Sequence, residues 1–222
     1  MSSDQNPTSI LYELYQQYLI DQDTAALIKG VSQRYMPVTL ERLAERGDRV
    51  TRRAAVLSLG FLANYDSNAV LGRALHDQDR GVRTLAENSV QAVWKRAGTP
   101  AQCEQLAVIV RLNNSQQYEK AVELADKLLE QAPWFAEIWN QRAVAYYNLA
   151  KYKLSIRDCH QTLEINPYHF GAATGMGQCY LQTGKRDAAL ESLRRALRLN
   201  PALEGVRAHV VQLERAEKDA QE

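Results

Sequence analysis

The sequence predicts an all-α protein of stacked helix hairpins, and three observations support this fold class. Apolar residues recur at i, i+3, i+4 and i+7, as in AVELADKLLEQA at residues 121–132, which is the spacing of one helix face. No stretch shows the apolar–polar alternation of a half-buried strand. Pro133, Pro167 and Pro201 recur at a constant interval, each after a helical stretch, and such a period is typical of stacked helix pairs.

Composition limits the functions that the chain can have. With 222 residues, of which 45% are apolar, the chain can bury a sizeable core. Lys and Arg number 27 against 26 Asp and Glu, so no overall field attracts nucleic acid or an anionic membrane. The start of the chain lacks the features of a secretory signal, and no apolar run approaches the roughly 20 residues of a membrane span. We therefore expect a cytoplasmic protein without membrane association.

The residues that could carry chemistry are dispersed. Cys103, Cys159 and Cys179 are widely spaced and form no Cys-x-x-Cys pair, so we expect three reduced thiols that pack as small apolar groups. The four histidines fall on separate elements, and no ligand cluster has metal spacing. We expect no catalytic residues, no metal and no cofactor.

The first element, expected at residues 1–16, is a helix that caps the start of the chain. Apolar and aromatic side chains lie on more than one side of the helix, namely Ile10, Leu11, Leu14, Tyr15, Tyr18 and Leu19. One apolar face would cover the first hairpin. A second apolar face would support a homodimer, which light scattering at several protein concentrations would detect.

Residues 17–98 repeat with a period of 31. The shift places Asp48, Arg52, Ala55, Ser58, Leu59 and Leu62 onto Asp79, Arg83, Ala86, Ser89, Val90 and Val93. A fixed shift of this kind predicts a second set of helix hairpins. The pattern of Asp, Arg and an Ala-rich helix resembles HEAT repeats of the short kind that also occurs in phycobilin lyases.

A short turn joins this region to the next. Gly98, Thr99 and Pro100 supply a helix stop, an N-cap and a proline for the first helical position. The helix expected at 101–112 falls where both periods place a helix. We expect it to serve both, which would make one continuous solenoid.

Residues 99–202 carry the period of the prolines in three copies. Superimposing the segments 102–135, 136–169 and 170–203 aligns small and aromatic residues: Tyr118, Ala121, Leu128, Trp139, Ala143, Tyr146, Tyr152, Met176, Gly177, Tyr180, Gly184, Ala189 and Ala196. These positions resemble the tetratricopeptide repeat, in which small residues let the two helices of a hairpin nest. The resemblance implies a right-handed α-α superhelix, closed by a capping helix and a charged tail at residues 203–222.

The stretch HFGAATGMGQCYLQTGK at 169–185 resembles a phosphate loop in its glycine content alone. A Walker loop needs Gly at the place where Cys179 stands, before Gly184, and Ser or Thr where Arg186 stands. We therefore place these glycines in a helix, with Gly177 for close packing and Gly184 at the end. Two explanations remain for Gly171 and Gly175: they let a partner approach the backbone, or they loosen the helix start and relieve a crowded crossing.

The resemblance implies a concave groove that binds a segment of another protein, so we expect a non-catalytic scaffold or adaptor. The residues expected to line this groove are Leu106, Val110, Asn113, Asn140, Val144, Tyr147, Asn148, Gly171, Gly175, Gln178 and Gln182. In related proteins that hold chaperone C-termini, a clamp of Lys and Asn binds the terminal carboxylate. The matching positions here are Leu106, Val110, Gln141, Gly171 and Gly175, none of them cationic. A neutral helix or extended peptide is the better match.

Two alternative functions remain open at this stage. Residues 37–97 hold nine Arg and one Lys against seven acidic residues, a net charge of +3, so Arg52, Arg53 and Arg83 could contact nucleic acid. The i, i+4 spacing of Asp48 with Arg52 and of Asp79 with Arg83 favours structural ion pairs instead. The HEAT-like pattern also allows a chromophore chaperone similar to the phycobilin lyases.

Overall fold

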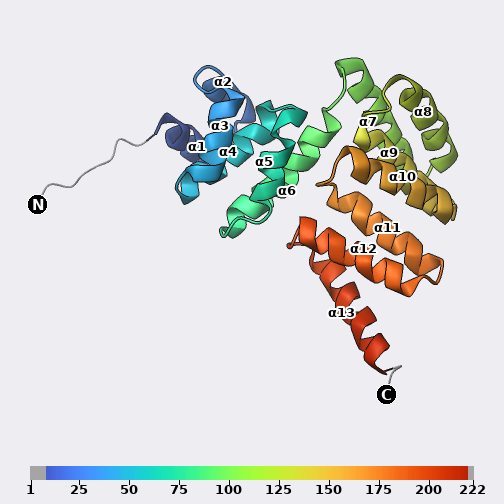
Figure 1. Ribbon diagram of the computed structural model, residues 1–222. Helices are drawn as coiled ribbons and strands as arrows, with labels where there is room; N and C mark the ends of the chain where they lie inside the picture. Colours follow the sequence, from blue (N-terminus) through green and yellow to red (C-terminus); the bar gives the residue numbers. More distant parts are fainter. Residues whose placement is uncertain (1–8, 220–222) are drawn as a thin grey trace, which may run out of the picture. The chain divides into compact units, whose positions relative to one another are not determined.

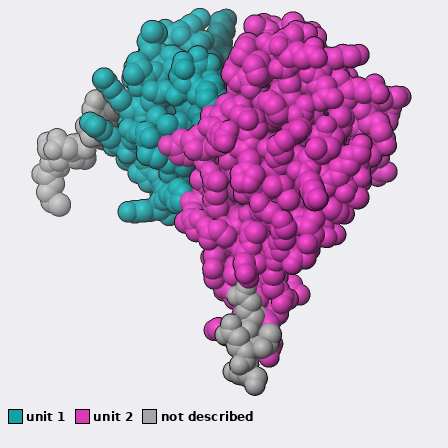
Figure 2. Space-filling model, turned by 45° about the vertical axis from the view of Figure 1, so that its right-hand side comes forward, with its two compact units in different colours: residues 1–93 teal, residues 94–222 magenta. Residues whose placement is uncertain are grey.

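The structure is a computed structural model that describes residues 9–219, and it confirms the all-α prediction (Figure 1). Thirteen α-helices, one short 3-10 helix and no strand are found within these residues. The chain divides into two compact units, residues 1–93 and 94–222 (Figure 2). None of the described helices combines the length and the hydropathy that a bilayer-spanning segment needs.

The first unit consists of short helices joined by tight turns. They are α1 (Ile10–Asp21), α2 (Thr24–Ser32), α3 (Pro37–Arg46), α4 (Arg49–Leu62), the 3-10 helix η1 (Tyr65–Ser67), α5 (Asn68–Ala74) and α6 (Arg80–Lys95), whose last turn enters the second unit. α3 and α5 start at equivalent positions of the period found in the sequence, and so do α4 and α6. The helix starts thus follow that period, while the assignment to HEAT-like repeats stays a prediction.

The first helix differs from its expected bounds. α1 continues beyond residue 16 and ends at Asp21, where Gln22 takes a left-handed conformation with φ 58°. Its N-terminal end is fixed by Ser9, whose Oγ accepts a hydrogen bond from Tyr12 N. The expected residues 1–8 of this element lie outside the described part of the chain.

Arginines of the first unit pair with aspartates of the following hairpin. Arg52 donates two hydrogen bonds to Asp77 (2.7 and 2.9 Å), and Arg53 donates two to Asp79 (both 2.7 Å). Asp48 instead accepts from Thr51 N (2.8 Å) as the N-cap of α4. The predicted i, i+4 pairs of Asp48 with Arg52 and Asp79 with Arg83 are therefore wrong in their partners, because Asp48 and Asp79 face the backbone amides at helix starts.

The second unit is a regular series of hairpins. Its helices are α7 (Pro100–Asn114), α8 (Tyr118–Gln131), α9 (Ala136–Asn148), α10 (Tyr152–Ile165), α11 (Phe170–Gln182), α12 (Arg186–Leu199) and α13 (Glu204–Asp219). The starts of α8, α10 and α12 recur at the same interval as the prolines, and so do those of α9, α11 and α13. Thr99 is the N-cap of α7, as predicted, and it also forms a capping box with Gln102.

The turn inside each hairpin repeats a backbone conformation at the same interval. Gln116, Ala150 and Gly184 all have positive φ, at 60°, 55° and 72°, and they occupy equivalent positions of successive repeats. Glycine adopts this conformation without a steric penalty, whereas a residue with a Cβ does not. The period predicted from the prolines is therefore also present in backbone dihedrals, and only the third turn has the residue that suits it.

Small residues allow the helices of the second unit to approach closely. Ala121, Ala125 and Ala145 are buried in a core cluster with Leu128 and Phe135. In the last hairpin, a Cβ added to Gly177 would lie 2.7 Å from Leu193 Cδ2. Gly177 therefore serves close packing, as predicted.

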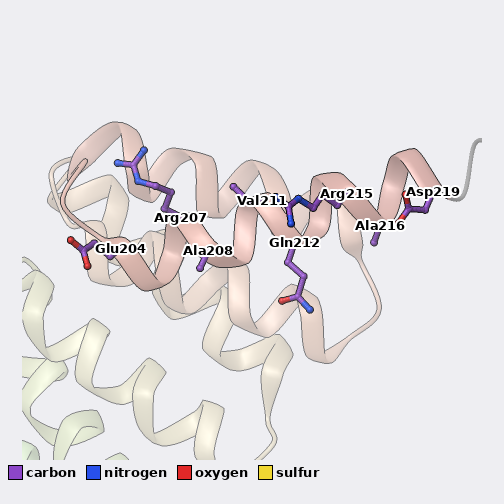
Figure 3. A pocket seen from close by; sticks show the side chains of 8 residues that line it. All are labelled: Glu204, Arg207, Ala208, Val211, Gln212, Arg215, Ala216 and Asp219. Atoms are coloured by element: carbon purple, nitrogen blue, oxygen red, sulfur yellow. The ribbon is translucent and has the colours of Figure 1, made fainter.

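The last helix closes the core on one side only. Val206 and Val210 of α13 pack into the cluster that also contains Leu190 and Leu193. The opposite side of α13 borders a shallow pocket of about 640 Å³, whose eight lining residues all belong to α13 (Figure 3). Because a single helix forms this pocket, it has no facing wall that could enclose a ligand.

Candidate functional site

A pocket of about 260 Å³ lies among α9, α10 and α11 of the second unit. Its lining consists of amide, aromatic and small apolar residues, none of which is charged: Asn140, Ala143, Val144, Tyr147, Asn148, Ser155, Cys159, Gly171, Gly175 and Gln178. Seven of the eleven residues that the sequence placed in a groove line this pocket. Their role in binding remains a prediction.

The other four predicted residues lie elsewhere. Leu106 is only 1% exposed and packs in the core with Ile109, so the prediction that it lines a groove is corrected. Asn113 is also buried, and its Nδ2 donates to the carbonyl and side-chain oxygens of Gln141. Val110 is half-buried against the same core, and Gln182 is exposed at the end of α11. None of these four lines the pocket.

Of the two glycines at the pocket, Gly175 is not required by packing. A Cβ added to Gly175 would meet Cys159 Sγ at 3.6 Å, which is ordinary contact. A Cβ on Gly171 would lie 3.3 Å from His169 Cε1, a tight but local contact at the second residue of α11. The alternative that Gly175 relieves a crowded crossing is therefore wrong. Each interior glycine still costs the helix roughly 0.8–1 kcal/mol relative to alanine.

Two asparagines that line the pocket have their NH₂ groups engaged in hydrogen bonds. Asn140 Nδ2 donates to Glu137 Oε1 at 3.2 Å, and Asn148 Nδ2 donates to the carbonyl of Val144 at 2.8 Å. Carboxylate and carbonyl oxygens accept hydrogen bonds and cannot donate them. The amide atom that faces such an oxygen is therefore the NH₂ nitrogen. Within residues 9–219, no hydrogen bond is formed by Oδ1 of either asparagine or by the side chains of Tyr147 and Gln178.

A buried carboxylate lies behind Asn140. Glu137 is in the first turn of α9 and is 4% exposed. Its Oε1 accepts from Gln141 Nε2 at 2.7 Å as well as from Asn140, and its Oε2 lies 2.9 Å from His169 Nε2. His169 Nδ1 accepts from Ala172 N at 3.0 Å, which requires an unprotonated Nδ1. With Nδ1 accepting this bond, Nε2 is the nitrogen that donates to Glu137.

The hydrogen bonds keep Glu137 charged. Burial alone would raise the pKa of the Glu137 carboxyl, but hydrogen bonds from His169, Gln141 and Asn140 outweigh burial and hold the pKa below its ordinary value. In contrast, burial raises the pKa of the Cys159 thiol at the pocket. Cys159 is therefore a neutral thiol, and the pocket lacks a reactive thiolate.

Arg142 positions α9 between its neighbours. Its guanidinium donates to Asp158 of α10 at 2.6 and 3.0 Å and to Asp126 of α8 at 2.5 Å. It also lies over the rings of Trp139 and Tyr146. These contacts hold the helix that supplies half of the pocket residues.

The other candidate surfaces have less support. Arg52 and Arg53 are held in bidentate ion pairs, and Arg83 donates to the carbonyl oxygens of Asp77 and Gln78. The arginines that the nucleic-acid alternative would use are therefore engaged in structural interactions. Among residues 9–219, no group of three or more metal-ligating side chains is brought together, and all three cysteines are free.

Sequence reasoning missed several residues of the site. Ala143, Ser155 and Cys159 line the pocket from α9 and α10, and Glu137 and His169 lie behind it. Glu137 precedes Asn140 and Gln141 at i, i+3 and i, i+4, a spacing that places all three on one helix face. That spacing was a usable signal for Glu137, whereas only the fold brings His169 to it.

Comparisons with known proteins identify one repeat by its sequence. Residues 171–203 match the family model of the tetratricopeptide repeat. A region of 82 residues is 33% identical to a TPR repeat-containing protein of Rhizobium etli and covers 37% of this chain and 40% of that protein. A region of 103 residues is 30% identical to the SGT1 homolog of Bos taurus, covering 46% of this chain and 30% of that protein. The chain thus spans less than half the length of either relative.

Two solved structures share the fold. One is the first TPR of Spaghetti (RPAP3) bound to the HSP90 peptide SRMEEVD, with a TM-score of 0.51 and 19% identity over 53% of this chain and 93% of that chain. The other is the first TPR domain of human RPAP3, with a TM-score of 0.51 and 18% identity over 54% and 94% of the two chains. The chain therefore carries a tetratricopeptide repeat at residues 171–203, within an α-solenoid of the fold that tetratricopeptide repeat structures share.

Proposed function

We propose that the protein is a non-catalytic scaffold that binds a segment of another protein over the pocket of α9, α10 and α11. The observation that carries this proposal is the combination of free amide oxygens with a bare backbone. Oδ1 of Asn140 and of Asn148 has no partner among residues 9–219, and packing does not require a glycine at position 175 of α11. Such a surface suits recognition of a peptide by hydrogen bonds and a side-chain anchor.

The structural relatives support a protein as the partner. The RPAP3 structure holds an HSP90 peptide with acidic residues, so this fold can bind a short segment. The pocket of the present chain has no lysine or arginine in its lining. We therefore propose a partner other than an acidic chaperone C-terminus, because a carboxylate would lose water here without gaining a cation.

A matched pair of variants tests the site. Val144 and Val211 are both 39% exposed, but only Val144 lines the pocket. Affinity capture from a lysate of the native organism should recover a partner with wild-type protein and with Val211→Glu. Val144→Glu should lose it, because a charge would occupy the apolar part of the pocket. Equal recovery by the two variants would remove this pocket as the binding site.

A further inference from the structure

We propose that the pocket of α9, α10 and α11 accepts a cationic side chain, lysine or arginine, of the partner segment. This inference rests on the proposed function and adds the chemistry of the residue that enters. The sequence alone suggested a neutral segment, because the lining residues are uncharged. The structure adds the group directly behind that lining.

The first step is the orientation of the amides. Glu137 and the carbonyl of Val144 hold the NH₂ groups of Asn140 and Asn148. The oxygens of both amides are thereby left for a ligand, and an oxygen of this kind only accepts hydrogen bonds. A lysine ammonium or an arginine guanidinium is purely a donor. These two amide oxygens therefore match a cation better than a carboxylate.

The second step is charge. The carboxylate of Glu137 is buried and accepts hydrogen bonds from Asn140, Gln141 and His169. The amides of Asn140 and Gln141 solvate this charge but do not cancel it. The amide of Asn140 has its positive end toward Glu137 and its negative end away from it, so its dipole extends the potential of the carboxylate. A charge acts over a longer distance where burial lowers the effective dielectric constant.

The third step is the shape and the apolar lining of the pocket. A lysine or arginine side chain has an apolar stem and a charged tip. Ala143, Val144 and Cys159 provide apolar surface for the stem, and the absent side chains of Gly171 and Gly175 leave α11 open. Tyr147 lines the same pocket, and its ring packs edge-on against Tyr152 at a centroid distance of 5.7 Å. The face of a tyrosine ring attracts a cation.

Four peptides distinguish the possible occupants. We would titrate capped peptides of sequence GSAXASG, with Arg, Lys, Leu or Glu at X, into ¹⁵N-labelled full-length protein. The amide resonances of Gly171 and Gly175 report on occupancy of the pocket. The Arg and Lys peptides should shift both resonances and bind about five- to tenfold more tightly than the Leu or Glu peptide.

Charge variants identify the cause of that preference. Gln178→Lys places a positive charge in the lining and should abolish the preference for Arg and Lys, whereas Gln178→Glu should strengthen it. Gln105→Lys and Gln105→Glu are the controls, because Gln105 is exposed on α7 and does not line the pocket. Glu137→Gln should weaken binding of the Arg peptide severalfold, provided that circular dichroism shows a folded protein. If it does not fold, the Gln178 pair still decides.

The outcomes separate this inference from the proposed function. Equal or tighter binding of the Leu or Glu peptide at Gly171 and Gly175 would overturn the cationic preference and leave a peptide-binding pocket. Absence of any shift at the two glycines would also overturn it. The scaffold proposal fails by a different result, namely undiminished partner capture by Val144→Glu.

Discussion

Arg142 connects several parts of the second unit through one side chain. Its guanidinium carbon lies 4.7 and 5.8 Å from the ring centroids of Trp139 and Tyr146, and its nitrogens pair with Asp158 and Asp126. Asp158 is fully buried, with a relative exposure of 0%. A buried carboxylate without its cation is costly, so the pair matters mainly through what its removal leaves behind.

Replacing Arg142 by Met should therefore destabilise the protein strongly. We expect the free energy of unfolding to fall by about 3–5 kcal/mol, because Asp158 would lose its main buried partner. Arg157 also contacts Asp158, but its side chain is 59% exposed. Arg157→Met should cost less than about 1 kcal/mol. Urea unfolding of the two variants measures this difference, and similar losses would contradict the assignment.

Two neighbouring glycines of α11 should respond to alanine in opposite directions. Gly175→Ala should stabilise the protein by up to about 1 kcal/mol, because the helix gains propensity and the new Cβ meets Cys159 Sγ at 3.6 Å. Gly177→Ala should destabilise it, because the new Cβ would lie 2.7 Å from Leu193. Thermal unfolding of both variants provides the measurement. Destabilisation by Gly175→Ala would show that packing does require that glycine.

At the scale of elements, the turns between paired helices carry unequal strain. Ala150 and Gly184 occupy equivalent left-handed positions in successive hairpins. A left-handed residue with a Cβ costs roughly 1–2 kcal/mol more than in its usual conformation. The second hairpin thus has a strained residue where the third has glycine. The first hairpin is strained in the same way, because Gln116 also has positive φ.

Exchanging the turn residues should expose this difference. Ala150→Gly should raise the free energy of unfolding by about 0.5–1 kcal/mol, the relief of strain being partly offset by the entropy of glycine in the unfolded chain. Gly184→Ala should lower it by a similar amount. Chemical denaturation of both variants gives the two signs. Equal signs would mean that the turns relax into another conformation.

The ion pairs between hairpins of the first unit make that unit sensitive to acid. The hydrogen bond from Arg53 holds the pKa of the Asp79 carboxyl well below its usual range, although burial opposes this effect. A pKa that is lower in the folded state contributes stability above the unfolded value of about 3.9. That contribution is lost as the pH falls through the folded value.

Asp79→Asn should therefore matter at neutral pH and less in acid. We expect a loss on the order of 1.5–3 kcal/mol near neutrality, because a charge-assisted bidentate pair is removed. The difference from wild type should shrink as the pH is lowered below about 4. Urea unfolding at several pH values tests this, with exposed Asp66→Asn as the control. A difference that stays constant with pH would contradict the role of the carboxylate charge.

At the scale of the whole molecule, the second unit has core clusters of its own. Two core clusters of the second unit contain only residues between Ala97 and Leu213. A fragment of residues 94–222 should therefore unfold cooperatively in urea. Residues 94–203 alone should be less stable, because Val206 and Val210 of α13 are missing from the core. A fragment 94–222 that lacks a cooperative transition would show that its core depends on the remainder of the chain.

The sequence predicted the helices better than the site. Period and caps determine helix starts locally, so Pro133, Thr99 and Gly184 were sufficient to place hairpins and turns. The pocket depends on which side chains meet across helices, which local sequence does not determine. Seven of the predicted groove residues line the pocket, whereas Leu106 belongs to the core. The ion-pair partner predicted for Arg52 was also wrong, since its actual partner, Asp77, lies 25 residues away in the sequence. Glu137 was missed although its spacing to Asn140 and Gln141 was a usable signal, whereas its contact with His169 follows only from the fold.

The stacking of Trp94 on His169 gives the molecule an intrinsic optical probe. The two rings lie 4.2 Å apart with an interplanar angle of 20°, and Trp94 is 3% exposed. Indole emission depends on the polarity and charge of such neighbours, so fluorescence should follow events at the Glu137 carboxylate without any label. Trp134 is 57% exposed, and its replacement by Phe would remove the main solvent-exposed background. Ligand titrations could then be followed at micromolar protein in a standard fluorimeter.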